Sequence, residues 1–167
     1  PKPVSDPSSL ISVGGSVEIS AKRAARLGLP FVPAVRDDSL EKAYYAEARE
    51  VGYENPMCMM PSGAGMVMVS EDPERLWSDI GENLIYDAVT YASWQYQDQR
   101  SSWHVEGASI DELKKGGQHL IVTPEECVDL VRSNGAVVLH PLVGGLDPEI
   151  GWESLELVAD RVIPALN

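Results

Sequence analysis

The sequence predicts an α/β fold with parallel strands, and three observations support this fold class. Short apolar runs alternate with longer amphipathic segments along most of the chain. Glycine or proline follows the apolar runs, where a strand would give way to a turn. Several amphipathic segments begin with residues that cap helices. Strands that alternate with helices favour βαβ units, whose strands pair in parallel.

The first such unit begins near Leu10. The apolar run 10–13 predicts a strand that ends at the pair Gly14-Gly15. Ser16 occupies the position of a helix N-cap, and apolar residues recur from there at helical spacing until Gly28. The next apolar run, 30–33, predicts a second strand. This stretch therefore predicts strand, glycine turn, helix and strand in sequence.

The remaining elements follow from the same kinds of signal. Ser39 is the expected N-cap of a second helix, and Asp72 begins the longest helix of the chain. Thr123 opens a capping box, so a further helix starts there. An apolar stripe that includes Trp152 predicts a last helix, which ends at Pro164. These signals predict helices over 40–51, 73–93, 124–134 and 148–163, and strands over 65–69 and 136–139, while residues 120–122 form either a short strand or an extended segment.

Two stretches lack a clear period. Residues 1–9 have the composition of a linker, and residues 94–117 predict a long loop or insertion within a single domain spanning 1–167. The long loop contains Trp94, Trp103 and His104 among polar residues. Two interpretations remain open for this loop. It either orders over a ligand or partner, or packs its aromatic residues against the protein surface.

The composition is that of a globular protein with a strong acidic excess. Of 167 residues, 44% are hydrophobic and 23% are charged, and the net charge is −13. This charge argues against non-specific binding to nucleic acid or to an anionic membrane surface. No apolar run approaches the length of about 18 residues that a membrane span needs. The two cysteines, Cys58 and Cys127, lie far apart outside any CxxC motif, so we expect a reduced, cytoplasmic setting.

The pair Gly14-Gly15 has a possible chemical use. Glycines after a strand let a ligand approach the backbone, and the helix that follows directs unpaired N–H groups and its positive dipole end at the same point. This arrangement suits a phosphate group. The alternative is that the glycines only form a tight turn. A second glycine pair, Gly144-Gly145, precedes the last helix, but Asp147 beside it would repel an anion.

The number of strand–helix units limits the architecture. Four such units correspond to half of a (β/α)8 barrel, whose complete form needs eight. An open doubly wound sheet is the rival architecture. In both, ligands bind at the carboxyl ends of strands, so His140, which follows the last strand, and His104, in the long loop, are candidate substrate-binding residues. Each histidine has a structural alternative, because a His-Pro pair such as that at His140 often only turns the chain.

A metal site is not expected. The three histidines have neither an H-x-x-x-H spacing nor a cysteine nearby, and His119 is expected to be exposed. The pair Glu125-Glu126 belongs to the capping box rather than to an acid–base site. No residue is assigned as catalytic.

Four segments, in order, resemble the bacterial luciferase-like monooxygenase superfamily. They are GGSVEISAKRAARLGLPFVPA near the start, MVMVSEDPERLW from Met66, HLIVTPEECVDLV from His119, and HPLVGGLDPEIGWESLELVADRVIPAL at the end. Each motif alone is weak, but four in the same order are fairly specific. The match is to the C-terminal half of the family's barrel.

The resemblance implies a TIM barrel that uses FMN or coenzyme F420 to oxidise or reduce a small organic substrate. It places Gly14, Gly15, Ser16 and Val17 at the cofactor phosphate. The first four strands of such a barrel have no counterpart in this sequence, so it is expected to be a fragment, a separately expressed half, or one chain of a composite barrel that a homo-oligomer or a partner chain completes. Two alternatives stay open: a non-catalytic half-barrel that works by assembly, and an unrelated phosphate-binding α/β enzyme.

Overall fold

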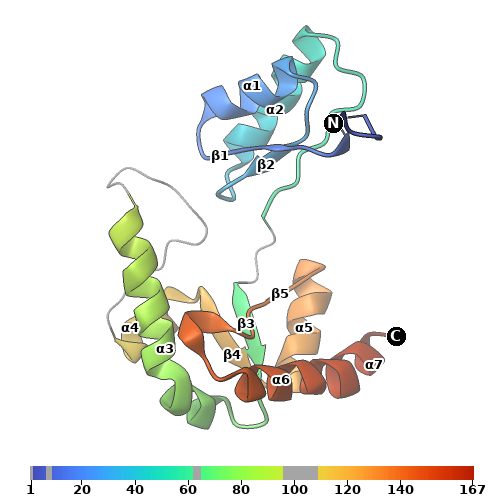
Figure 1. Cartoon of the computed structure of the whole chain (residues 1–167). Coiled ribbons are helices and arrows are strands. Elements are labelled where there is room, and N and C mark those ends of the chain that lie inside the picture. Colours follow the sequence, from blue (N-terminus) through green and yellow to red (C-terminus); the bar gives the residue numbers. More distant parts are fainter. Residues whose placement is uncertain (1, 7–8, 62–64, 96–108) are drawn as a thin grey trace. The chain divides into compact units, whose positions relative to one another are not determined.

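The computed structural model describes residues 2–6, 9–61, 65–95 and 109–167. The chain divides into two compact units, one ending at Pro61 and the other containing the described residues from Gly65 onward (Figure 1). The sequence predicted one domain, whereas each of these units has a hydrophobic core of its own. No helix within the described residues combines the length and apolar character needed to cross a lipid bilayer.

The first unit contains the predicted βαβ arrangement. Strand β1 (Val13–Gly15), helix α1 (Glu18–Arg26), strand β2 (Phe31–Pro33) and helix α2 (Asp38–Glu50) follow one another. β1 and β2 pair in parallel, with Val13 opposite Phe31, and Phe31 also forms a parallel bridge with Cys58. β1 starts later than predicted because Pro30, which accepts from the Val13 N–H, has no N–H to extend the ladder backwards.

Small side chains bring the two helices of the first unit together. Ala21, Ala24 and Ala25 of α1 are fully buried, and they pack with Leu40 and Tyr44 of α2 and with the helix-facing side of the strands. The Tyr44 hydroxyl donates to the Leu29 carbonyl at 3.0 Å and accepts from the Met57 N–H at 3.2 Å. Burial raises the pKa of Tyr44 to about 12, so this phenol stays protonated and joins α2 to the sheet.

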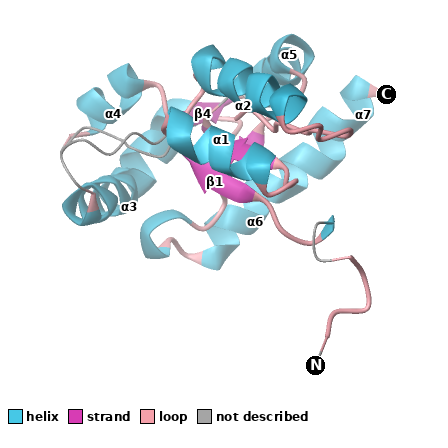
Figure 2. Ribbon diagram, turned by 90° about the horizontal axis from the view of Figure 1, so that it is seen from above, coloured by secondary structure: helices cyan, strands magenta, loops and turns pink. Residues whose placement is uncertain are grey.

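The second unit is built around a three-stranded parallel sheet in the order β4-β3-β5 (Figure 1). Figure 2 colours the helices cyan and the strands magenta. Its elements are β3 (Met66–Val69), α3 (Pro73–Trp94), α4 (Ile110–Gly116), β4 (His119–Val122), α5 (Pro124–Asn134), β5 (Val138–Leu139), the 3-10 turn η2 (Val143–Gly145), α6 (Pro148–Leu157), the π-helical turn η3 (Val158–Val162) and α7 (Ile163–Leu166).

All four residues of β3 are buried, because helices cover both faces of this sheet. The side chains of Met66 and Met68 pack against α3 and α4, on what we call the methionine face. Val67 and Val69 pack on the opposite face, against α5 and η3. An apolar residue at every position is typical of a parallel strand that is covered on both sides.

The strand order differs from that of a barrel. Consecutive strands of a (β/α)8 barrel are neighbours, whereas here β3 lies between β4 and β5. The connection from β4 to β5 passes over β3. This also happens in the open doubly wound sheet, which was the rival prediction. The parallel α/β class is thus confirmed, but this sheet does not confirm the half-barrel.

Two of the four predicted helix N-caps form where the sequence placed them, and two do not. Thr123 and Glu126 form the full capping box, and Asp72 caps α3. At α2, however, Asp37 is the cap rather than Ser39, whose N–H and hydroxyl both bond the Asp37 carboxylate. The prediction that Ser16 caps α1 was also wrong, because Val17 occupies the cap position.

Two longer segments also differ from expectation. The predicted loop 94–117 contains α4, which Ser109 caps, while residues 96–108 lie outside the described part of the chain. The last helix does not end at Pro164, because the π turn η3 leads directly into α7. Trp152 was expected in the buried stripe but is 63% exposed, since the core side of α6 carries Gly151 and Ser154 instead.

Candidate functional site

The predicted phosphate-binding residues lie together where β1 runs into α1. Gly14 and Gly15 end β1, and Ser16 connects the strand to Val17, the N-cap residue of α1. Val17 has extended backbone angles (φ −133°, ψ 153°), is 50% exposed, and makes no side-chain capping bond. The first intrahelical bonds come from the Ser20 and Ala21 N–H groups to the Val17 carbonyl. The backbone N–H groups of the first turn therefore lie at a helix start that no side chain caps. This helix start is at the carboxyl end of a parallel strand.

Close packing explains Gly15 but not Gly14. A Cβ at Gly15 would overlap the side chain of Ser20 in the first turns of α1. A Cβ at Gly14 would meet only the Val32 carbonyl oxygen, at 3.8 Å, which is an ordinary contact. Gly15 thus lets the strand approach the helix start, whereas the absence of a side chain at the exposed Gly14 has no packing reason in this unit.

One charge works against an anion at this helix start. Glu18 lies in the first turn, and its carboxylate forms an ion pair of 2.7 Å with Lys22 one turn later. Both side chains are well exposed, so water screens them and the pair neutralises Glu18 only in part. The other cations of α1, Arg23 and Arg26, lie in its last turn, and Arg26 bonds the buried Glu47 carboxylate of α2 at 2.6 Å. The site therefore relies on backbone N–H groups and the helix dipole for anion binding.

A cavity of about 390 Å³ lies in the second unit at the carboxyl end of β3. It is lined by Val69, Ser70, Glu71, Asp72, Arg75, Leu76, Asp79, Ile150, Glu153, Ser154 and Leu157. Four of these side chains are carboxylates and one is a guanidinium, so the cavity does not suit a phosphate. Glu71 is also paired with Arg161 of η3 at 2.9 Å, and Asp72 caps α3. No group of three or more ligating His, Cys, Asp or Glu side chains occurs among the described residues.

His140 follows β5 and faces a second histidine. Its backbone N–H donates to the Val67 carbonyl at 3.0 Å. The centre of its ring lies 6.4 Å from that of the His119 ring at the start of β4. The cavity between the two rings has a volume of about 10 Å³, enough for roughly one water molecule. This cavity is far smaller than a cofactor or substrate, so substrate binding by His140 stays a prediction. His104, the other candidate, lies outside the described residues.

The expectation that His119 is exposed was wrong. It is 3% exposed, and its Nε2 has no hydrogen-bond partner among the described residues. Burial lowers the pKa of His119, and the neighbouring His140 lowers it further, while Asp87 of α3 acts in the opposite direction. The sequence held a signal for this burial, because His119 alternates with Ile121 in a short apolar strand.

The second glycine pair has a packing role. Gly144 and Gly145 both have positive φ angles, of 54° and 74°. A Cβ at Gly144 would overlap the Asn83 backbone of α3, and the Asn83 side-chain amide donates to the Gly144 carbonyl at 3.1 Å. This contact joins η2 to α3, which favours the phosphate site at Gly14 over one at Gly144.

No protein-family model matches the chain, and no curated protein matches it.

Proposed function

We propose that this chain binds the phosphate group of a flavin-type cofactor at Gly14, Gly15, Ser16 and Val17, and that it is part of an FMN- or F420-dependent oxidoreductase. The observation that carries the proposal is the uncapped start of α1, directly after a glycine pair at the carboxyl end of β1. The resemblance of four ordered sequence segments to the luciferase-like monooxygenases supports the choice of cofactor.

The residues present fit a phosphate group better than any other part of a flavin. Backbone N–H groups at a helix start bind phosphate without a cationic side chain. Gly14 has no side chain to fill the space beside these N–H groups. The Val17 side chain is exposed, so it leaves the N–H groups accessible. When bound, FMN or F420 would supply the redox chemistry, while these residues hold its phosphate. His140 is the candidate for contact with the small organic substrate.

Catalysis would need the rest of a barrel, supplied by a further segment, a partner chain or a second copy of this chain. Both helices of the first unit pack on one side of its strands, as helices do around a barrel. The side chains of Met57 and Met59 flank the bridge residue Cys58 and are 48% and 44% exposed. A parallel sheet is normally covered on both faces. The exposed methionines are therefore where we propose that another part of a barrel would pack.

Titration of the purified chain with FMN and F420, followed by fluorescence, tests the cofactor proposal. We expect saturable binding that inorganic phosphate competes away. Gly15→Val should abolish binding, because its side chain overlaps Ser20 and displaces the start of α1. Circular dichroism of this variant separates a local effect from unfolding. Absence of binding by the folded wild-type chain at millimolar cofactor would reject a cofactor site in this chain alone.

A charge variant tests the site without disturbing its packing. Glu18→Gln removes the negative charge from the first turn of α1, so phosphate should bind several-fold more tightly. The matched control is Glu50→Gln, which makes the same change at an exposed position at the C-terminal end of α2. Equal effects of the two substitutions would indicate a general charge effect and would contradict binding at the α1 start.

A non-catalytic half-barrel is the second candidate, and the exposed Met57 and Met59 favour it. In that case the chain should form a defined oligomer without any cofactor. Light scattering after size-exclusion chromatography measures this. Met59→Lys should then dissociate the oligomer, whereas Lys2→Met, at an exposed position outside the sheet, should leave its mass unchanged.

A further inference from the structure

His119 is a buried histidine in an apolar setting. It pairs with Met66 in the β4–β3 register, so its side chain lies on the methionine face of the sheet. Met68, Leu84 and Ile121 line the small cavity beside it. A neutral imidazole is tolerated in such a place, whereas an imidazolium would lose its hydration. The site therefore discriminates between the two protonation states.

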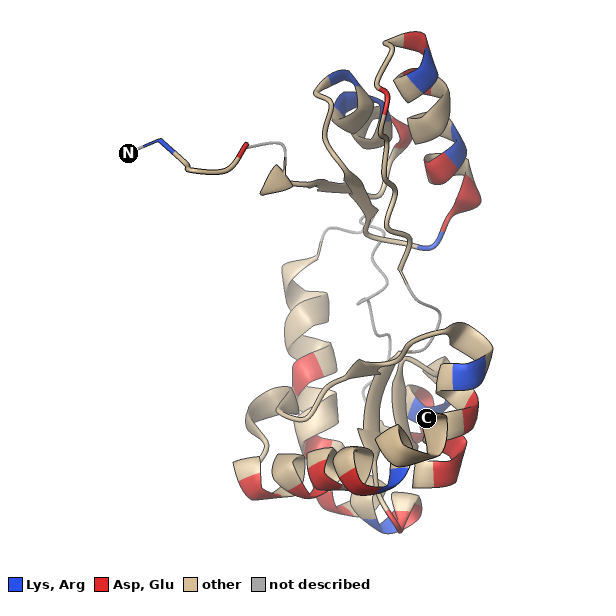
Figure 3. Cartoon of the chain, turned by 90° about the vertical axis from the view of Figure 1, so that its right-hand side faces the viewer, with Lys and Arg blue, Asp and Glu red and all other residues tan. Residues whose placement is uncertain are grey.

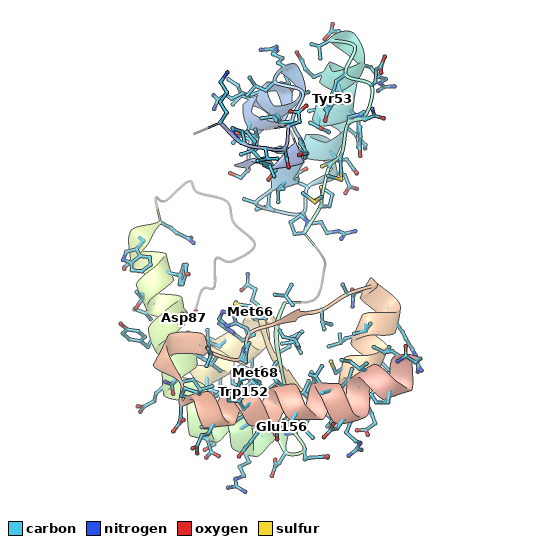
Figure 4. The ribbon with its side chains drawn as sticks, turned by 45° about the vertical axis from the view of Figure 1, so that its right-hand side comes forward. Tyr53, Met66, Met68, Asp87, Trp152 and Glu156 are labelled. Atoms are coloured by element: carbon cyan, nitrogen blue, oxygen red, sulfur yellow. The ribbon has the colours of Figure 1, made fainter. Side chains whose placement is uncertain are left out.

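The groups that face His119 offer a charged imidazole little compensation. From β3 it meets methionines, and beyond β3 it meets His140, which disfavours a positive charge on His119. From α3, Asp87 favours the charged form. Figure 4 labels Asp87 together with Met66 and Met68. On α4, Lys114 bonds Glu74 at 2.7 Å and lies over the Trp77 ring. The other charged residues of α4, namely Asp111, Glu112 and Lys115, are exposed.

We propose that His119 and His140 form an acid-sensitive contact, at which protonation of His119 loosens the packing of α3 against the methionine face. The affected element would be α3, because its Leu84 lines the cavity beside His119 and its Asp87 interacts electrostatically with the imidazole. Opening of this face would let water reach the imidazolium.

The direction of the pH dependence follows from linkage. The pKa of His119 is lower in the folded chain than the ordinary value of 6.5. The unfolded chain therefore binds more protons in mild acid, so the contribution of His119 to stability is complete above that ordinary value. It is lost as the pH falls toward the folded pKa. Each unit of difference between the two pKa values corresponds to about a tenfold loss in the folding equilibrium constant.

Urea unfolding between pH 8 and pH 5, combined with hydrogen exchange of α3 and NMR titration of the histidine rings, tests the proposal. In the wild-type chain we expect His119 to titrate below the ordinary range, with a several-fold loss of exchange protection in α3 at acid pH. His119→Gln keeps a neutral polar side chain and should flatten the acid loss. His140→Gln removes the repulsive neighbour and should move the His119 titration upward.

His104→Gln is the matched control, since it removes the third histidine of the chain. The acid response should persist in this variant. The proposal is overturned if His119 titrates at an ordinary value, if the acid loss is the same in His119→Gln, or if His104→Gln abolishes it. Should His119→Gln fail to fold, the wild-type titration and its shift in His140→Gln still decide the question.

Discussion

Ser154 closes a gap that the short strand β5 leaves in the second unit. β5 ends at Leu139, and Pro141 turns the chain away before it can pair with the end of β3. The Val69 N–H donates instead to the Ser154 hydroxyl of α6, at 2.7 Å. Because this side chain is buried, it both satisfies a buried backbone donor and joins α6 to β3.

Replacing this hydroxyl should be costly. Ser154→Ala leaves the buried Val69 N–H without its acceptor, so we expect the free energy of unfolding to fall by about 1–3 kcal/mol. Urea unfolding at neutral pH measures the change. Ser133→Ala, at an exposed position of α5, is the control and should stay within about 0.5 kcal/mol. An equally small change in both variants would show that water replaces the Ser154 hydroxyl.

Among the helices, α1 and α2 depend on small side chains at their contact. Ala21, Ala24 and Ala25 present no side chain longer than a methyl group to α2, and all three are fully buried. The Arg26–Glu47 pair crosses the same contact at its edge. Most of the Arg26 side chain is exposed, so the pair orients the two helices more than it stabilises them.

A larger residue at the centre of this contact should separate the helices. Ala24→Leu adds three carbon atoms where no space exists, and we expect a loss of about 1–3 kcal/mol in unfolding free energy. Ala46→Leu makes the same substitution at an exposed position of α2 and should change stability little. Thermal unfolding of both variants provides the comparison. If Ala24→Leu were no less stable than Ala46→Leu, the contact would be looser than the structure shows.

The π turn η3 joins elements at the carboxyl end of the second sheet. Its Arg161 bonds Glu71 after β3 at 2.9 Å and Glu125 at the start of α5 at 3.0 Å. All three side chains are exposed, so each pair alone contributes little. Extra residues in a helical turn often mark functional sites, and here Arg161 of the turn pairs with Glu71, which lines the acidic cavity at the end of β3.

At the scale of the whole molecule, the negative charge dominates. Acidic side chains, red in Figure 3, occur on helices of both units, and the net charge is −13. Repulsion among these charges opposes the compact state of each unit. The few exposed ion pairs, such as Lys22–Glu18, offset only a small part of it.

Salt should therefore stabilise this chain. Raising NaCl from about 20 mM to about 150 mM shortens the screening length to roughly 8 Å, so the melting temperature should rise. Differential scanning calorimetry at pH 7.5 measures this, and KCl should give the same rise. Sulfate stabilises folded proteins by another mechanism, exclusion from the protein surface, so its effect on the melting temperature is compared with that of NaCl. A melting temperature that falls with NaCl would mean that ion pairs outweigh the repulsion.

How much of this structure could be read from the sequence depends on the range of each signal. The helix starts at Asp72, Thr123 and Asp147 were readable, because a cap involves residues only two or three positions apart. The parallel pairing of the strands followed from their alternation with helices. The candidate phosphate-binding residues were predicted in the same way, since a strand, a glycine pair and a helix are consecutive in the chain.

The sequence by itself thus determined the alternation of strands and helices, the caps at Asp72 and Thr123, and the candidate phosphate turn. Only the tertiary structure decided that β3 lies between β4 and β5, that His119 is buried beside His140, and that Trp152 is exposed. These features depend on contacts between residues far apart in the chain, and many arrangements satisfy the same local signals. Packing of the whole unit selects one of them, because only one buries the methionine face of β3 and satisfies its backbone N–H groups together.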